Sequence, residues 1–157
     1  MAAFTLSVAA GARALSSAAR DAAWKLGRLN HVAIAVPEME KARSFYREVL
    51  GGRVSEAVPL AEHGVSTSFV ELGNAKLELL EPLGPDSPIL GFLRSRGLGG
   101  IHHICIEVER LPAAVQQLRA HRVRTLSPGP QIGAHGKPVI FLHPKDCGGV
   151  LVELEEA

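Results

Sequence analysis

The chain has 157 residues, close to the usual size of one domain. Hydrophobic residues make up 46% of it and charged residues 21%, which excludes a long disordered protein, and it holds no apolar run of the length that crosses a membrane. A net charge of +1 without a basic block argues against nucleic acid as the main partner, and two cysteines, Cys105 and Cys147, cannot form a disulfide framework.

The first 25 residues differ in composition from the rest of the chain. They are rich in alanine and serine, and within the first 28 residues four basic side chains accompany a single acid, Asp21. A basic, serine-rich and acid-poor start is typical of a mitochondrial targeting segment, although a frayed N-terminus without an address has a similar composition. We therefore assign 1–25 to a transit segment, expect a protein of the mitochondrial matrix, and assign 26–157 to one domain.

The domain is predicted to begin with a strand followed by an amphipathic helix. Residues 29–36 alternate and are rich in β-branched side chains, which is typical of a strand, and Pro37 ends it. Residues 38–50 place apolar side chains on one helical face, and Gly51 provides a stop. Three shorter strands are expected at 53–58, 65–72 and 75–81.

The same order of elements is expected again after a linker. The linker covers 84–100 and is predicted to hold a short helix at 89–94. A strand at 101–108 then precedes a helix that begins near Pro112. Further strands are expected near 123–126, 138–143 and 149–155.

An internal repeat supports two βαβββ modules, at about 27–83 and 100–157, and hence an α+β protein. The string His-Val-Ala-Ile-Ala-Val that begins at His31 returns 72 residues later, at His103, as His-Ile-Cys-Ile-Glu-Val. The other matches are His63 with His135, Phe69 with Phe141, and Leu77-Glu78-Leu79 with Val152-Glu153-Leu154. Several matches in the same order, with one insertion at a turn, indicate a duplicated module.

Two histidines and two glutamates occupy matched positions of this repeat. His31 and His103 are each followed by small residues on the same strand face, which we expect to leave room for a cavity. Glu78 and Glu153 interrupt apolar strands, where a carboxylate is costly without a partner. Two imidazoles and two carboxylates suit a divalent transition metal with open positions for substrate. The four residues are therefore candidate metal ligands.

Other reactive side chains are given lesser roles. The tandem of His102 and His103 is ambiguous alone, but only His103 aligns with the histidine of the first module. His63 and His135 precede glycines in turn-like segments, so we expect them in loops or at the rim of a site. The two cysteines lack the spacing of a zinc site and are expected to be bystanders.

Five segments of the chain carry a resemblance to a known family. They read LNHVAIAVP at 29–37, GIHHICIEV at 100–108, GAHGKP at 133–138, HPKD at 143–146 and GVLVEL at 149–154. They closely resemble the methylmalonyl-CoA epimerases, in particular those of animal mitochondria, within the vicinal oxygen chelate or glyoxalase-like superfamily. The resemblance extends over about 27–157.

This resemblance implies a fold, a reaction and a set of roles. The paired modules would form one cupped, barrel-like sheet, the protein would be a homodimer, and the metal would be a cobalt-type divalent ion. The substrate would be a CoA thioester, inverted at C2 through an enolate in propionate breakdown. The resemblance carries ligand roles onto His31, His103 and Glu153, and Glu153 is our candidate catalytic base. Bacterial members place glutamine where this chain has Glu78, and glutamate is an equally good oxygen ligand.

One position of the resemblance leaves the mechanism open. Bacterial members have a second catalytic glutamate at the place of Thr67, and threonine is a poor base. The second proton carrier is therefore not identified by the sequence. Two other functions also remain as alternatives, because a fold does not fix its function. One is another metal enzyme of the superfamily, of the glyoxalase or extradiol dioxygenase type, and the other is a metal-free protein that binds a small molecule.

Overall fold

The computed structural model describes residues 24–157, so the segment assigned to mitochondrial targeting lies almost wholly outside the described residues. The strands are β1 (Leu26–Ala35), β2 (Arg53–Val54), β3 (Val58–Leu60), β4 (Val65–Glu71), β5 (Lys76–Pro82), β6 (Gly100–Val108), β7 (Gln131–Ile132), β8 (Pro138–Leu142) and β9 (Val152–Glu156). The α-helices are α1 (Met39–Ser44), α2 (Leu90–Arg96) and α3 (Leu111–Ala120). Short 3-10 turns lie at Ala61–His63 and Pro144–Asp146.

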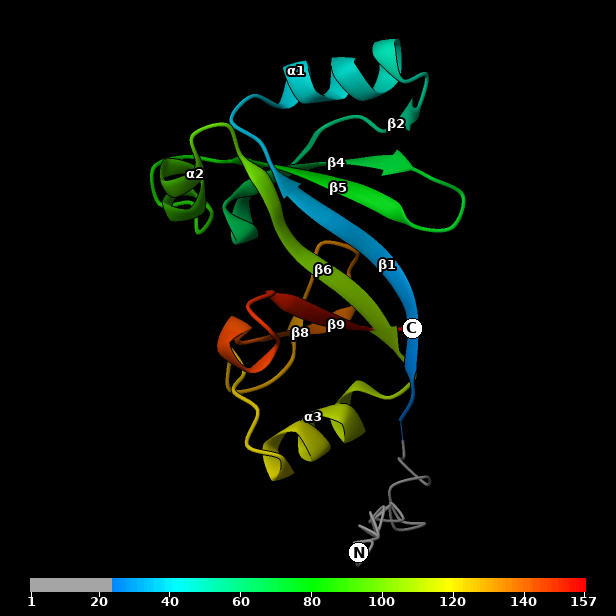
Figure 1. The fold of residues 1–157 in the computed structure, drawn as a ribbon, viewed down its shortest axis with the longest axis vertical. Coiled ribbons are helices and arrows are strands. Elements are labelled where there is room, and N and C mark those ends of the chain that lie inside the picture. The colour runs from blue at the N-terminus through cyan, green and yellow to red at the C-terminus, as the bar shows by residue number, and fades with distance from the viewer. Residues whose placement is uncertain (1–23) are drawn as a thin grey trace, which may run out of the picture.

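These strands form one mixed sheet that joins the two modules. Its order across the described residues is β2-β4-β5-β1-β6-β9-β8-β7, and β3 pairs with β4. β1 and β6 are the long first strands of the two modules and pair with each other in antiparallel fashion, while β5 lies parallel to β1 and β9 parallel to β6. The sheet is cupped and open rather than closed (Figure 1). The predicted α+β fold of two related modules is confirmed.

α1 and α3 cover one face of the central strands, while α2 packs against part of the other face. α1 packs on the first module and α3 on the second, at opposite ends of the molecule (Figure 1). Ile34 and Val36 of the first module belong to the core cluster beneath α1, as the alternation of the strand predicted. Ala33 and Ala35 point the other way, but they pack with Ile89 and Leu93 instead of lining a cavity. None of the helices within 24–157 is both long and apolar enough to span a membrane.

The helix predicted at 38–50 is present, but its second half is π-helical instead of α-helical. The α-helix proper covers Met39–Ser44, and a π-helical turn at Phe45–Val49 continues it. The amide of Leu50 donates to the carbonyl of Phe45 over 3.2 Å, a spacing of five residues. Gly51 follows with a φ of 67°, which favours glycine and ends the helix where the sequence predicted.

The strand predicted at 53–58 is divided into β2 and β3. Between them, buried Arg43 donates from Nε to the Ser55 carbonyl oxygen over 3.1 Å and pairs with the Glu56 carboxylate at 3.0 Å. These contacts hold this stretch beside α1, and the strand pairing is interrupted there.

Two strand predictions in the second module are also corrected. The strand expected near 123–126 is only an isolated bridge between Thr125 and Leu142, because Pro128 and Pro130 follow and proline cannot donate to a ladder. The last strand begins at Val152, and not at 149, because Gly148 and Gly149 turn the chain with φ values of 64° and 85°.

Candidate active site

The duplicated register brings the four candidate ligands to the same place on the sheet. Glu78 on β5 lies beside Ala33, which is two residues after His31 on β1. Glu153 on β9 lies beside Cys105, which is two residues after His103 on β6. Residues two apart on a strand share a face, so each module points one histidine and one glutamate to the same side. The antiparallel pairing of β1 with β6 then sets the two pairs against each other.

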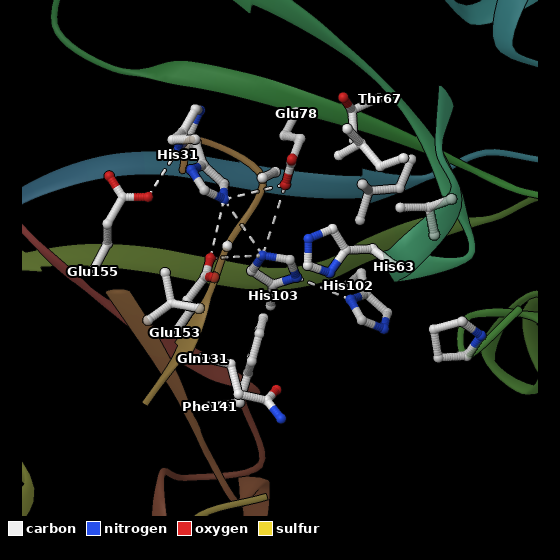
Figure 2. Close-up of a pocket in the computed structure, with 18 of the residues that line it drawn as sticks. His31, His63, Thr67, Glu78, His102, His103, Gln131, Phe141, Glu153 and Glu155 are labelled. Atoms are coloured by element: carbon white, nitrogen blue, oxygen red, sulfur yellow. Dashed lines mark hydrogen bonds and ion pairs between the residues drawn. The ribbon is translucent and has the colours of Figure 1, made fainter. Parts of the chain in front are cut away.

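The four side chains converge on one point (Figure 2). His31 Nε2 lies 3.4 Å from His103 Nε2, 3.2 Å from Glu78 Oε2 and 3.4 Å from Glu153 Oε2. His103 Nε2 lies 3.8 Å from Glu78 Oε2 and 3.3 Å from Glu153 Oε2. These separations of 3.2–3.8 Å are of the size expected between donor atoms that share one first-row metal ion, which imidazole and carboxylate bind at roughly 2.0–2.2 Å.

Burial and charge act strongly on this cluster. All four side chains are buried. Burial opposes the charged form of His31, but hydrogen bonds and charge from Glu153 and Glu78 outweigh it and raise its pKa to about 9. Burial likewise opposes the charged form of Glu153, yet His103 and His31 lower its pKa to about 2. Without a metal ion, the protonated imidazole of His31 therefore balances the charge of the Glu78 and Glu153 carboxylates. A bound cation can supply that positive charge instead.

These pKa shifts predict an unusual pH dependence for the metal-free protein. The stabilisation from the raised pKa of His31 is complete below its ordinary pKa of 6.5 and is lost as the pH rises through about 9, which corresponds to about 3 kcal/mol. The stabilisation from the lowered pKa of Glu153 is complete above 4.5 and is lost as the pH falls through about 2. The melting temperature of chelator-treated protein should therefore be highest between pH 4.5 and 6.5 and should fall towards pH 9.

The matched control is His31→Gln, in which the decline between pH 6.5 and 9 should be much smaller. Added cobalt should stabilise the native protein more as the pH rises, because metal ligands must be deprotonated. A melting temperature that rises from pH 6.5 to 9 in chelator would contradict this electrostatic description of the site.

Both ligand histidines are preceded by a residue that bulges out of the ladder. Leu29 and His31 lie opposite Ile106 and Cys105, so Asn30 is an extra residue on β1. Ala33 and Ile34 lie opposite His103 and Ile101, so His102 is an extra residue on β6. A β-bulge re-aims side chains that simple alternation would send to the other face.

The two bulged residues make equivalent contacts. Asn30 Oδ1 lies 2.9 Å from His31 Nδ1, and His102 Nδ1 lies 2.9 Å from His103 Nδ1. A metal bound at both Nε2 atoms would leave each Nδ1 as a donor, and the bulged residue would accept that hydrogen bond. Burial and the nearby charge of His103 lower the pKa of His102 to about 4, so its imidazole is neutral and able to accept. Strand alternation alone gives no sign of this orienting role of Asn30 and His102.

The contact between His102 and His103 gives a second testable expectation. His102→Ala should reduce metal affinity about 10–100-fold, the usual effect of losing a partner that orients a ligand. The site should still fill at saturating metal, because the four convergent atoms remain. Competition with a coloured chelator measures the affinity, and His121→Ala, at an exposed position after α3, is the control. Equal affinities of His102→Ala and the unchanged protein would argue against an orienting role.

A cavity of about 340 Å³ opens onto this cluster. Besides the four candidate ligands, its polar lining includes His63, Thr67, His102, Gln131, His135 and Glu155, and apolar side chains such as Leu60, Leu126 and Phe141 complete the wall. His63 lies in the exposed turn before β4, and His135 lies in the turn between β7 and β8. Both were expected in loops or at a rim, and both line the cavity.

The two cysteines differ in their relation to the site. Cys105 is fully buried, and its Sγ lies within 4.8 Å of possible ligand atoms of His31 and Glu153. Burial and the neighbouring carboxylates raise the pKa of its thiol strongly, so it stays protonated. Cys147 packs beside the core under α3, away from the cavity.

Comparison with known proteins agrees with this architecture. Residues 30–141 match the family model of the glyoxalase, bleomycin resistance protein and dioxygenase superfamily. The mitochondrial methylmalonyl-CoA epimerase of Mus musculus is 69% identical over 134 residues, covering 85% of this chain and 75% of that protein. The ethylmalonyl-CoA/methylmalonyl-CoA epimerase of Cereibacter sphaeroides is 56% identical over 132 residues, covering 83% and 98%.

A solved structure extends the comparison to three dimensions. A variant of the Streptomyces coelicolor methylmalonyl-CoA epimerase, in complex with 2-nitronate-propionyl-CoA, superposes with a TM-score of 0.78 at 34% identity, covering 85% of this chain and 99% of that one. The fold, the duplicated cluster and the family match agree. The chain belongs to the glyoxalase, bleomycin resistance protein and dioxygenase superfamily.

Proposed function

We propose that this chain is a metal-dependent epimerase, which interconverts the R and S forms of methylmalonyl-CoA at C2. The observation that carries the proposal is the convergence of two imidazole nitrogens and two carboxylate oxygens beneath a cavity large enough for a small acyl group. The substrate is suggested by relatives that are named methylmalonyl-CoA epimerases and are 56–69% identical to this chain.

The donor set fits a divalent metal held by His31, Glu78, His103 and Glu153. Two carboxylates neutralise a doubly charged ion, and two imidazoles favour a transition metal over magnesium or calcium. These four residues would hold the ion, and the ion would supply Lewis-acid stabilisation of charge on substrate oxygens. We propose a cobalt-type ion on these grounds and on the family resemblance.

The reaction requires removal and return of one proton at C2. A bound ion would act as a Lewis acid that stabilises negative charge on substrate oxygens. Within the chain, Glu153 takes the C2 proton as general base, and the resulting enolate spreads its charge onto the thioester carbonyl. Apolar side chains such as Leu60, Leu126 and Phe141 in the cavity wall lower the local polarity, which strengthens these electrostatic contacts. A proton delivered to the opposite face of C2 gives the other epimer.

Location, boundaries and assembly complete the proposal. We propose that residues 1–25 direct import to the mitochondrial matrix, on the basis of their composition and of mitochondrial relatives. Residues 26–157 would then be one mature domain with modules at about 27–83 and 100–157. The family resemblance supports a homodimer, which light scattering on the purified protein tests.

One experiment tests the activity directly. A single epimer of methylmalonyl-CoA is incubated with the metal-loaded protein in deuterated water, and the C2 position is followed by NMR and mass spectrometry. We expect formation of the other epimer together with uptake of deuterium at C2. Oxygen uptake by the iron-loaded protein would instead identify a dioxygenase. Binding of a small molecule without metal and without turnover would identify a binding protein.

A further inference from the structure

A pair of carboxylates lies face to face beside the candidate metal centre. Glu107 on β6 is the register partner of Glu155 on β9. Glu155 is only 2% exposed, and the side chain of Glu107 is 13% exposed. Like charges directly opposite each other on a sheet are destabilising, and buried carboxylates are costly without donors. A pair of this kind lowers the stability of the fold unless another group binds both carboxylates.

The first module shows that the fold does not require this pair. Glu107 and Glu155 correspond in the repeat to Ala35 and Leu80, which are register partners on β1 and β5. The same place in the sheet is filled there by a buried apolar pair. Apolar side chains usually stabilise such a place as well as buried charges do, or better. The two carboxylates therefore serve something other than the packing of the sheet.

The side chain of Asn30 joins the two carboxylates. Its Nδ2 donates to Oε1 of Glu107 over 3.0 Å and to Oε1 of Glu155 over 3.3 Å. An ionised carboxylate can only accept hydrogen bonds, so the NH2 end of the Asn30 amide must face this pair. The hydrogen bond from Arg28 lowers the pKa of Glu107, which keeps that carboxylate ionised. The Asn30 amide is therefore held in one of its two orientations.

The fixed amide decides which ring nitrogen of His31 carries a proton when the ring is neutral. With its NH2 group bound to the carboxylates, Asn30 directs Oδ1 at His31 Nδ1, 2.9 Å away. That oxygen can only accept, so Nδ1 must donate, and Nε2 keeps the lone pair of the neutral ring. Nε2 is the atom of His31 that faces the other three candidate ligands. The lone pair is therefore on the side where the ion would bind.

We propose that Glu107 and Glu155 are positioning residues of the metal centre, and that they act through the amide of Asn30. Their effect is to present Nε2 of His31 to the ion. The inference rests on the proposed metal centre and adds to it two residues that do not bind the ion themselves. The equivalent support is missing around His103, because the corresponding positions of the first module are apolar.

The test replaces the carboxylate pair by the residues of the first module, in the double variant Glu107→Ala with Glu155→Leu. An apolar pair is already accommodated at the equivalent place, so this variant should fold cooperatively. Its zinc affinity, measured by competition with a coloured chelator, should fall by about 10–100-fold, the usual effect of losing groups that orient a ligand. In the zinc-loaded variant, the Nδ1 proton of His31 should exchange with solvent faster, as measured by NMR.

A third substitution, Asn30→Asp, should restore the double variant. An aspartate carboxylate can only accept, so it offers an acceptor to His31 Nδ1 in either orientation and needs no other carboxylate to hold it. Zinc affinity and slow exchange of the Nδ1 proton should both return. Asn30→Leu, added to the same double variant, offers no acceptor and should restore neither.

The matched control is Glu71→Ala with Glu109→Ala, which removes the same net charge at exposed positions and should leave zinc affinity unchanged. Unchanged zinc affinity in the double variant would overturn the proposal, as would failure of that variant to fold or equal effects of Asn30→Asp and Asn30→Leu. A loss of affinity with unchanged exchange of the His31 Nδ1 proton would also overturn it, because the carboxylates would then attract the ion by charge alone. Failure of the unchanged protein to bind zinc would instead overturn the proposed metal centre itself.

Discussion

Glu153→Gln is expected to abolish most turnover while the protein still holds metal. The amide oxygen of glutamine can coordinate an ion, but an amide cannot accept a proton at neutral pH. Loss of a positioned base costs about 10²–10⁴-fold in rate. Bound metal per chain and the rate of C2 proton exchange, measured on the same preparation, separate these two effects. Wild-type exchange by Glu153→Gln with metal bound would exclude Glu153 as a base.

Glu78→Gln is the matched control for this prediction. Glu78 occupies the equivalent place in the first module and has a similar distance to His31, 3.2 Å against 3.4 Å for Glu153. We expect only a mild loss of activity, because the coordinating oxygen is preserved and Glu78 is not the proposed base. A loss as large as that of Glu153→Gln would mean that the two carboxylates share the proton transfer.

The sequence predicts the centre of this site because the duplication and the strand period act together. A strand places residues two apart on one face, and the repeat places the same residue types at the same register in both modules. The loop conformations are therefore not needed to predict that His31 lies near Glu78. The same holds for His103 and Glu153. Glu155 also lies two residues after Glu153, so the alternation could have identified it as a residue of the cavity face.

The residues around the four candidate ligands are placed by features that the alternation of a strand does not reveal. Asn30 and His102 reach the ligand histidines because each is an extra residue in the pairing of β1 with β6. A bulge arises from the hydrogen-bond pairing of two strands that are distant in the sequence. The alternation of either strand alone does not reveal it. His135 meets Glu155 across a hairpin turn whose conformation is set by Gly136, with a φ of 72°. Turn geometry of this kind decides that His135 reaches Glu155.

His103→Ala is expected to lose both metal and activity. The substitution removes one of four donors and leaves the buried carboxylates of Glu78 and Glu153 with fewer partners. Metal affinity should fall by more than the roughly 10–100-fold typical of an orienting residue, because a coordinating atom itself is lost. His102→Ala is the adjacent control and should still fill with metal at saturation. Metal analysis after dialysis, together with C2 exchange, measures both effects. Full metal occupancy in His103→Ala would mean that His102 can replace His103 as a ligand. The metal would then be held by His31, Glu78, His102 and Glu153.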